Sequence, residues 1–245
     1  MEQRIKEKLA GWMEKTAELL FPTRCPVCDG LLGTGILRMC QTCRQRVQYL
    51  SEPLCFQCGK KLSDCEAEFC GDCRRSRHLF TAGRALYEYE DIAPALYRFK
   101  YGGRREYAAF FARELAQQLG EYIRSLAPDG LVPVPMYRGK QRRRGYNQAE
   151  LLARALGKEL SIPVYSGLVV RSRDTKPLKE LNSEERRNNL KRAFNLGQNG
   201  VKLKKIVLID DIFTTGSTID QVSAVLLAGG SQMIYYIALA IGAGI

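Results

Sequence analysis

From Thr81 to the end of the chain, short apolar runs alternate with stretches of helical periodicity. Apolar runs predict strands at 85–89, 131–135, 162–170, 204–212 and 233–241. Apolar residues that recur every three or four positions predict helices at 92–99, 106–126, 147–160 and 218–227. Strands that alternate with helices imply an α/β domain over 81–245, in which helices flank a parallel sheet.

The first 80 residues follow other patterns. Residues 1–22 predict one amphipathic helix, because Leu9, Met13 and Leu20 fall on one face. Its polar face mixes both charge signs, which favours packing against the rest of the protein over a membrane surface or a docking partner. Residues 74–80 are expected to link the preceding cysteine-rich segment to the α/β domain. We expect His78, the only histidine, to be a linker or surface residue.

Eight cysteines between 23 and 76 form four Cys-x-x-Cys pairs, which begin 15 residues apart. Each pair places two thiolates on one side of a tight turn, and two pairs complete a tetrahedral Zn–S₄ site. Redox pairs are the competing interpretation, but a redox enzyme rarely needs four of them. The predicted ligands of two structural zinc ions are Cys25, Cys28, Cys40, Cys43, Cys55, Cys58, Cys70 and Cys73. Residues 23–76 are therefore expected to form a double zinc ribbon.

The spacing leaves the pairing of these four motifs open. Sequential pairing, first with second and third with fourth, is the simplest arrangement. A cross-braced arrangement fits the same spacing. Cys65 stands outside the repeat and is expected to be a free thiol or a small loop residue.

Composition limits the class of protein and its partners. The 245 residues are 45% hydrophobic and 26% charged, enough for one large domain and a small one. No apolar run approaches the ~20 residues of a membrane span and no secretory leader is found, so we expect a cytoplasmic protein. The net charge of +12 would fall to +8 with two zinc sites of charge −2 each. Such a balance suits nucleic acid or a multiply phosphorylated ligand.

The stretch 206–219 combines groups that suit a phosphorylated sugar. An apolar run predicts a buried strand, and Asp210 and Asp211 follow it. The next polar residues before the helix are Thr214, Thr215, Gly216, Ser217 and Thr218. Gly216 permits a tight turn, and the free N–H groups at the helix start face an anion. The two carboxylates suit sugar hydroxyls or Mg²⁺ rather than phosphate. A solvated strand end with an ordinary helix cap is the alternative, and no Walker Gly-Lys-Ser/Thr is present.

Residues 207–218 resemble the phosphoribosyl-pyrophosphate (PRPP) loop of type I phosphoribosyltransferases. The resemblance implies that Asp210 and Asp211 hold the ribose hydroxyls and that residues 214–218 hold the 5′-phosphate. Three further segments, 132–135, 144–148 and 185–194, together with the ribbons, resemble the ComF competence family, which joins a zinc ribbon to a phosphoribosyltransferase-like domain. Members usually carry Thr-x-Gln, where this chain has Thr175-Lys176-Pro177, so no role is assigned to that glutamine.

The family resemblance implies a cytosolic component of natural transformation that acts on incoming single-stranded DNA and binds a PRPP-like ligand with Mg²⁺. Other competence proteins would be its protein partners. Candidate pyrophosphate or anion ligands are Arg138, Lys140, Arg142, Arg143 and Arg144. No general base or base-specific pocket is recognisable, so the catalytic residues and the transferase activity stay open. A salvage phosphoribosyltransferase and a PRPP-sensing regulator are the alternative functions.

The segment 97–105 has two interpretations of equal weight. Tyr97, Phe99 and Tyr101 interleave with basic residues, a mix that suits base stacking and phosphate contact. The same aromatic residues would also suit a hydrophobic core.

Overall fold

The computed structural model describes residues 22–33, 38–173, 193–197 and 201–242. The predicted N-terminal helix and most of the polar segment after residue 171 lie outside these ranges. Contacts divide the chain into two compact units, Met1–Val47 and Gln48–Ile245. The first four zinc-ligand cysteines belong to the first unit, and the other four share the second unit with the sheet. The domain boundaries at 22, 76 and 81 stay a prediction.

In the first unit, the cysteine pairs organise a small irregular structure. An isolated antiparallel bridge joins Arg24 to Leu31. The helix α2 (Gln41–Arg46) begins directly after Cys40, whose Sγ accepts a hydrogen bond from the Cys43 N–H. A cysteine thus takes the place of the serine or aspartate that usually caps a helix N-terminus.

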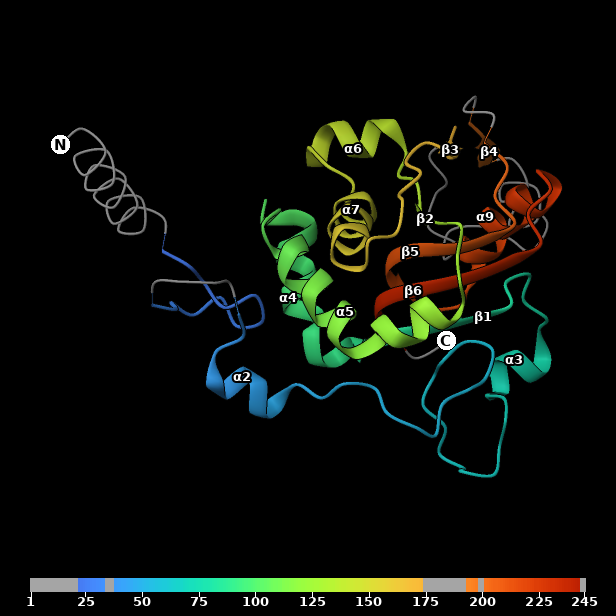
Figure 1. Ribbon diagram of the computed structural model, residues 1–245. Coiled ribbons are helices and arrows are strands. Elements are labelled where there is room, and N and C mark those ends of the chain that lie inside the picture. Colours follow the sequence, from blue (N-terminus) through green and yellow to red (C-terminus); the bar gives the residue numbers. More distant parts are fainter. Residues whose placement is uncertain (1–21, 34–37, 174–192, 198–200, 243–245) are drawn as a thin grey trace. The chain divides into compact units, whose positions relative to one another are not determined.

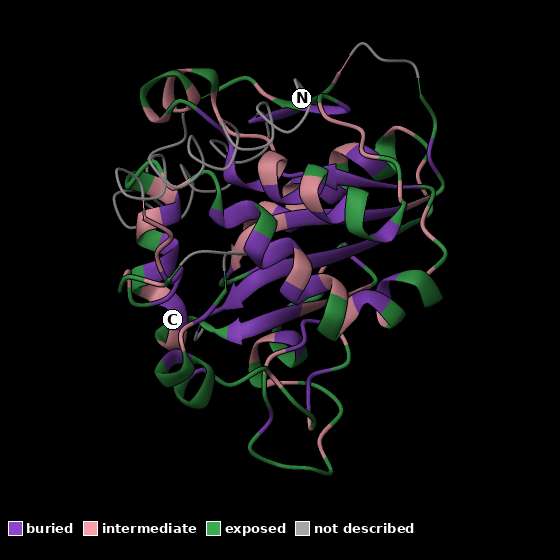
Figure 2. Cartoon of the chain, turned by 60° about the vertical axis from the view of Figure 1, so that its left-hand side comes forward, coloured by how far each residue is buried: buried purple, intermediate pink, exposed green. Residues whose placement is uncertain are grey.

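The second unit is built on a four-stranded parallel sheet with the order β1–β6–β5–β2 (Figure 1). These strands are β1 (Ala82–Glu88), β2 (Gly130–Pro133), β5 (Lys205–Phe213) and β6 (Met233–Ile241). The two central strands, β5 and β6, are mostly buried, as Figure 2 shows for the sheet. The predicted α/β class with a parallel sheet is therefore confirmed, and the predicted range of β6 is correct.

Helices connect the strands, as the parallel order requires. The connecting helices are α4 (Tyr89–Tyr101), α5 (Tyr107–Ser125), α6 (Arg138–Arg144), α7 (Gln148–Leu160) and α9 (Ser217–Ala228), while the short helix α3 (Gly71–Arg75) precedes β1. Helices α5 and α7 pack together, and α7 also contacts β2 and β5. Among the described residues, no helix combines the length and the apolar character that crossing a bilayer requires.

One hydrophobic cluster joins α9, the sheet and the second set of cysteines. It includes Cys58, Phe213, Ile219 and Tyr236. The Phe213 and Tyr236 rings stack with their centroids 4.4 Å apart. The second ribbon therefore packs into the core of the α/β unit.

Two sequence predictions need correction. The strand predicted at 162–170 is reduced to a single bridge at Val164 and to β3 (Val169–Arg171), which pairs antiparallel with β4 (Phe194–Leu196) outside the main sheet. Pro163 cannot donate a ladder hydrogen bond, and Gly167 has φ 86°, so a continuous strand is interrupted at both places. No helix was predicted at 138–144, where the structure has α6, since these residues have no apolar period.

Candidate functional site

Two clusters of four thiols have the geometry of zinc sites. Each cluster keeps its Sγ atoms within 4.8 Å of one another, and they consist of Cys25, Cys28, Cys40 and Cys43, and of Cys55, Cys58, Cys70 and Cys73. The Sγ atoms of Cys28 and Cys40 are 3.7 Å apart, and those of Cys58 and Cys70 are 3.5 Å apart. A tetrahedron with Zn–S bonds of about 2.3 Å has edges of about 3.8 Å. The sites fit zinc, and the sequential pairing is confirmed.

In the first site, the local backbone favours the thiolate of Cys40. The Cys43 N–H donates to the Cys40 Sγ and lowers the pKa of that thiol to about 7. Zinc binds the thiolate form, so this helix start already prepares one ligand. With four thiolates and no open position, such a site holds the fold rather than activating a substrate.

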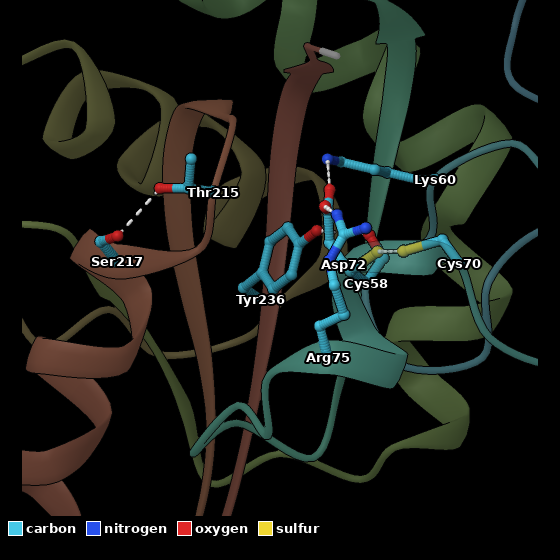
Figure 3. Close-up of polar contacts among 8 residues, drawn as sticks. All are labelled: Cys58, Lys60, Cys70, Asp72, Arg75, Thr215, Ser217 and Tyr236. Carbon is cyan, nitrogen blue, oxygen red and sulfur yellow. Dashed lines mark hydrogen bonds and ion pairs between the residues drawn. The ribbon is translucent and has the colours of Figure 1, made fainter. Parts of the chain in front are cut away.

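The β5–α9 loop, residues 214–218, forms a turn at the end of a buried strand. Gly216 is the N-cap of α9 and has φ 77°, a left-handed conformation that glycine adopts without strain. The Oγ1 of Thr215 and the Oγ of Ser217 form a hydrogen bond, drawn in Figure 3, with the two oxygens 2.8 Å apart. Thr214 and Thr215 are exposed. Two hydroxyls and the free N–H groups at the start of α9 therefore meet at one place, an arrangement that can accept an anion.

His78 corrects a sequence prediction, since it is neither a surface residue nor a simple linker. Its side chain is only 6% exposed, and its Nδ1 lies 2.8 Å from the Oδ2 of Asp220 in the first turn of α9. The Leu79 N–H donates to the other oxygen of Asp220. A Cβ atom on Gly216 would come within 2.7 Å of the His78 ring. His78 thus packs against the β5–α9 loop through Asp220 and Gly216. No local sequence pattern reveals this contact, because the residues are more than 100 positions apart.

The acidic pair, Asp210 and Asp211, lies near the end of β5, with a lysine against it. The Nζ of Lys100, in the last turn of α4, is 2.5 Å from the Oδ2 of Asp211. That oxygen has the ion pair but no hydrogen bond of good geometry among the described residues. Burial raises the pKa of Asp210 to about 7, an effect that the charge of Lys100 opposes. Burial lowers the pKa of Lys100 to about 8.

The segment 144–148 holds the end of α4, and so the position of Lys100. The Tyr146 hydroxyl donates to the Phe99 carbonyl at 2.5 Å, and the Gln148 amide donates to the carbonyls of Phe99 and Lys100 at 3.4 Å each. Arg144 donates to the Gln148 side chain at 2.6 Å. These groups satisfy carbonyls that the helix end would otherwise leave unpaired.

Asn147 fixes this segment to the sheet and starts the next helix. Its side-chain oxygen accepts from the Ala149 N–H at 3.2 Å, and its amide donates to the Val134 carbonyl at 3.0 Å. Asn147 is therefore the N-cap of α7, the helix predicted at 147–160. The carboxylate of Glu150, three residues later, accepts a hydrogen bond from Arg154.

The predicted anion ligands on α6 are brought together on one short helix without buried residues. Arg144 donates to Gln148, whose amide in turn donates to the end of α4 beside the acidic pair. The structure brings Asp210, Asp211 and the β5–α9 loop together along one chain segment.

A cavity of about 140 Å³ lies between the second ribbon and the β5–α9 loop. Lys60, Asp72, Arg75 and Thr215 line it together with His78. Asp72 pairs with Lys60 and with Arg75 at 2.7 Å each, as Figure 3 shows beside Tyr236. No sequence pattern indicated Lys60 or Arg75, because only the packing of the ribbon on the sheet brings them to the loop.

Comparisons with known proteins match both parts of this architecture. Residues 16–74 match the double zinc ribbon domain family. The chain is 32% identical over 224 residues to Competence protein F of Haemophilus influenzae, which covers 87% of this chain and 95% of that protein. The chain belongs to the ComF family.

Two other ComF relatives match over most of their length. DNA utilization protein YhgH of Escherichia coli is 30% identical over 220 residues, which cover 88% of this chain and 96% of that protein. Competence protein ComFC of Bacillus subtilis is 28% identical over 227 residues, which cover 84% and 89%. The predicted ComF membership is thus confirmed over the ribbons and the α/β unit together.

Proposed function

We propose that this ComF protein acts in DNA uptake or utilization, binds a phosphoribosyl ligand such as PRPP with Mg²⁺, and contacts single-stranded DNA. The names of its relatives, two competence proteins and a DNA utilization protein, support the role in DNA uptake. The observation that supports a phosphoribosyl ligand is the order of groups along β5 and α9. An acidic pair is followed by two hydroxyl residues and then by a glycine in the left-handed conformation at a helix start.

The two ends of this segment suit the two ends of a phosphorylated sugar. The hydroxyls of Thr215 and Ser217 and the N–H groups at the start of α9 offer donors to a phosphate. The carboxylates of Asp210 and Asp211 offer acceptors to the ribose hydroxyls. The distance along the chain between these groups is short, so one small ligand can reach both.

The donor set at the acidic pair also fits Mg²⁺, which prefers carboxylate oxygens and usually keeps several waters. Lys100 now supplies the positive charge there, at 2.5 Å from Asp211. Mg²⁺ with PRPP would neutralise the diphosphate and take over this role. Asp210 and Asp211 would orient the ion and the ribose, and Lys100 would be released toward the diphosphate oxygens.

Titration calorimetry with PRPP and Mg²⁺ tests the ligand. We expect wild-type protein to bind and the Asp210→Asn/Asp211→Asn variant to lose at least about a hundredfold in affinity, since charge-assisted bonds are lost together. Glu90→Gln/Asp91→Asn is the matched control, because it removes the same charge from adjacent acidic residues of α4. Equal affinity of all three proteins would contradict the assignment.

The same samples can test for transferase activity. Release of pyrophosphate from PRPP on addition of a nucleobase would favour the salvage enzyme over a binding protein. We expect PRPP to bind without being consumed, because no base-specific pocket is recognisable in the sequence.

A further inference from the structure

Helix α4 has two aromatic side chains that face solvent. Tyr97 and Tyr101 are 65% and 63% exposed, and their ring centroids lie 5.1 Å apart. They are four residues apart, so they share one face of the helix. Phe99, between them, is fully buried. The structure thus separates the two interpretations of this segment: Phe99 belongs to the core, and the two tyrosines form an exposed pair.

Positive charge adjoins this pair. The guanidinium of Arg144 lies 4.6 Å from the centre of the Tyr101 ring. Arg144 ends α6, whose seven residues include five arginines or lysines, no acidic residue and no buried residue. Two exposed rings beside a basic helix combine the features of a surface that binds single strands: aromatic faces for bases and cations for the backbone.

We propose that Tyr97, Tyr101 and Arg144 form a stacking platform for the bases of single-stranded DNA, with the phosphates along α6. This inference rests on the DNA contact in the proposed function and gives it a location. Stacking needs no particular base, because every base has a π face, so the platform would bind strands of any sequence. The positive charge of α6 disfavours an apolar protein as the partner, since docking such a protein here would bury the cations of that helix.

The two tyrosines of the platform lie on the same turn of α4 as Lys100, which is ion-paired with Asp211. Lys100 is three residues after Tyr97 and points to Asp211, whereas Tyr97 and Tyr101 are exposed. Bonds from Tyr146 and Gln148 hold this helix end. A strand on the platform would therefore lie at the rim of the proposed phosphoribosyl site. The tyrosines can be removed without changing either Lys100 or the core.

A second aromatic pair is the competing location. Phe56 and Phe69 of the second ribbon lie 6.3 Å apart, edge to face, and with Arg74 and Arg77 they line a cavity of about 450 Å³. Their rings are exposed as well. We favour the tyrosine pair because a whole basic helix adjoins it, whereas two arginines adjoin the phenylalanine pair.

Fluorescence anisotropy with a labelled oligothymidylate, titrated at several salt concentrations, tests the platform. Loss of stacking on both rings should weaken binding by at least about tenfold in Tyr97→Ala/Tyr101→Ala. The slope of log affinity against log salt should stay unchanged, because no phosphate contact is lost. Tyr89→Ala, at the start of the same helix and also exposed, is the matched control and should bind as wild type does.

Two further measurements identify the kind of contact. Wild-type protein should quench the fluorescence of a strand that contains 2-aminopurine, because the probe base stacks on a tyrosine ring. The double tyrosine variant should quench this fluorescence much less. Arg142→Ala/Arg143→Ala should weaken binding and reduce the magnitude of the salt slope by about 1.4, or about 0.7 for each lost phosphate contact with a single strand. The tyrosine variant should keep wild-type affinity for PRPP with Mg²⁺, which shows that the fold and the acidic pair are intact.

The outcomes separate this inference from the proposed function. If wild-type protein binds the strand and the tyrosine variant binds equally well, the platform is wrong and the DNA contact stands. A tenfold loss in Phe56→Ala/Phe69→Ala, with no loss in the tyrosine variant, would move the contact to the ribbon and overturn the platform. If wild-type protein does not bind at low salt, both the platform and the proposed DNA contact fail, while PRPP binding is judged by its own titration.

Discussion

The two zinc sites have the same ligands and spacing but different surroundings. In the first unit, Cys28 is exposed and Cys40 is half-buried. In the second, Cys55 and Cys58 are at most 1% exposed and belong to the core of the α/β unit. The Tyr236 hydroxyl donates to the Cys58 carbonyl at 2.6 Å, and the Gly83 N–H donates to the Gln57 carbonyl at 2.8 Å. The first site therefore holds a small unit of its own, whereas the second is part of the sheet domain.

This difference shows that two copies of the same cysteine motif can have different structural roles. Residues that decide the difference, such as Tyr236, follow the second site by more than 150 residues in the chain. The second ribbon also adjoins the β5–α9 loop, the proposed phosphate site. Lys60 and Arg75 of the ribbon and Thr215 of the loop line the same cavity. We therefore expect loss of zinc at the second site to affect the α/β unit far more than loss at the first.

Removal of one ligand from each site should give the largest effect. Cys58→Ser should lower the free energy of unfolding of the α/β unit by more than about 3 kcal/mol, because the loss of a structural metal also loosens a buried part of its core. Cys43→Ser is the matched change in the first site, and should leave the main thermal transition where it is. Calorimetry and zinc analysis measure both, with one zinc lost in each variant. Equal shifts of the main transition would contradict the comparison.

A glycine from each unit tests the packing directly. A Cβ on Gly83 would come within 1.9 Å of the Tyr236 ring, whereas a Cβ on Gly33 would meet nothing within 4 Å. Gly83→Ala should destabilise the α/β unit by roughly 1–3 kcal/mol, the range for overpacking a core. Gly33→Ala should change the same transition by less than about 0.5 kcal/mol. Chemical denaturation followed by circular dichroism distinguishes the two, and a neutral Gly83→Ala would show that β1 does not pack against Tyr236 of β6 as described.

The stability of the α/β unit should depend on pH through the ionisation of Asp210. Burial raises the pKa of this carboxyl from 3.8 to about 7, so the folded state holds a proton that the unfolded state releases. Its contribution to stability is full below about pH 4 and is lost as the pH rises through 7. Asp210→Asn should therefore be more stable than wild type at pH 8, on the order of 2 kcal/mol, and close to it at pH 4. Denaturant titrations without ligand at the two pH values measure this, and the opposite pH trend would contradict it.

The smallest expected effect comes from one hydroxyl. Tyr236→Phe removes the bond to the Cys58 carbonyl and should destabilise the α/β unit by about 1 kcal/mol. Tyr235→Phe is the neighbouring control, since the Tyr235 hydroxyl contacts only the Met233 sulfur, at 3.9 Å, among the described partners. Differential melting of the two variants is the measurement. A larger effect in Tyr235→Phe would reverse the expected order.

Much of the core of the fold could be predicted from the sequence. The strand at 204–212 is found at Lys205–Phe213, and the strand at 233–241 has the predicted range. Both are long apolar runs at the centre of the sheet, where burial on two faces leaves a clear pattern. The eight zinc ligands were also predicted from their spacing, but their pairing was left open, and only the structure shows that it is sequential.

Other features depend on contacts that no local pattern contains. Helix α6 has the sequence RGKQRRR, whose polar character gives no period from which to predict a helix. His78 was expected to be a linker or surface residue and Lys100 was assigned no role, because their partners, Asp220 and Asp211, are more than 100 residues away. The exposed tyrosines and the buried phenylalanine of α4 alternate in sequence, and only the helix shows which of them reach solvent.

A crystal structure with PRPP and Mg²⁺ tests the central claim most directly. We predict a phosphate against residues 214–218, ribose hydroxyls at Asp210 and Asp211, and Lys100 moved away from Asp211. A crevice without ligand at saturating PRPP, with the Lys100–Asp211 ion pair intact, would contradict the account.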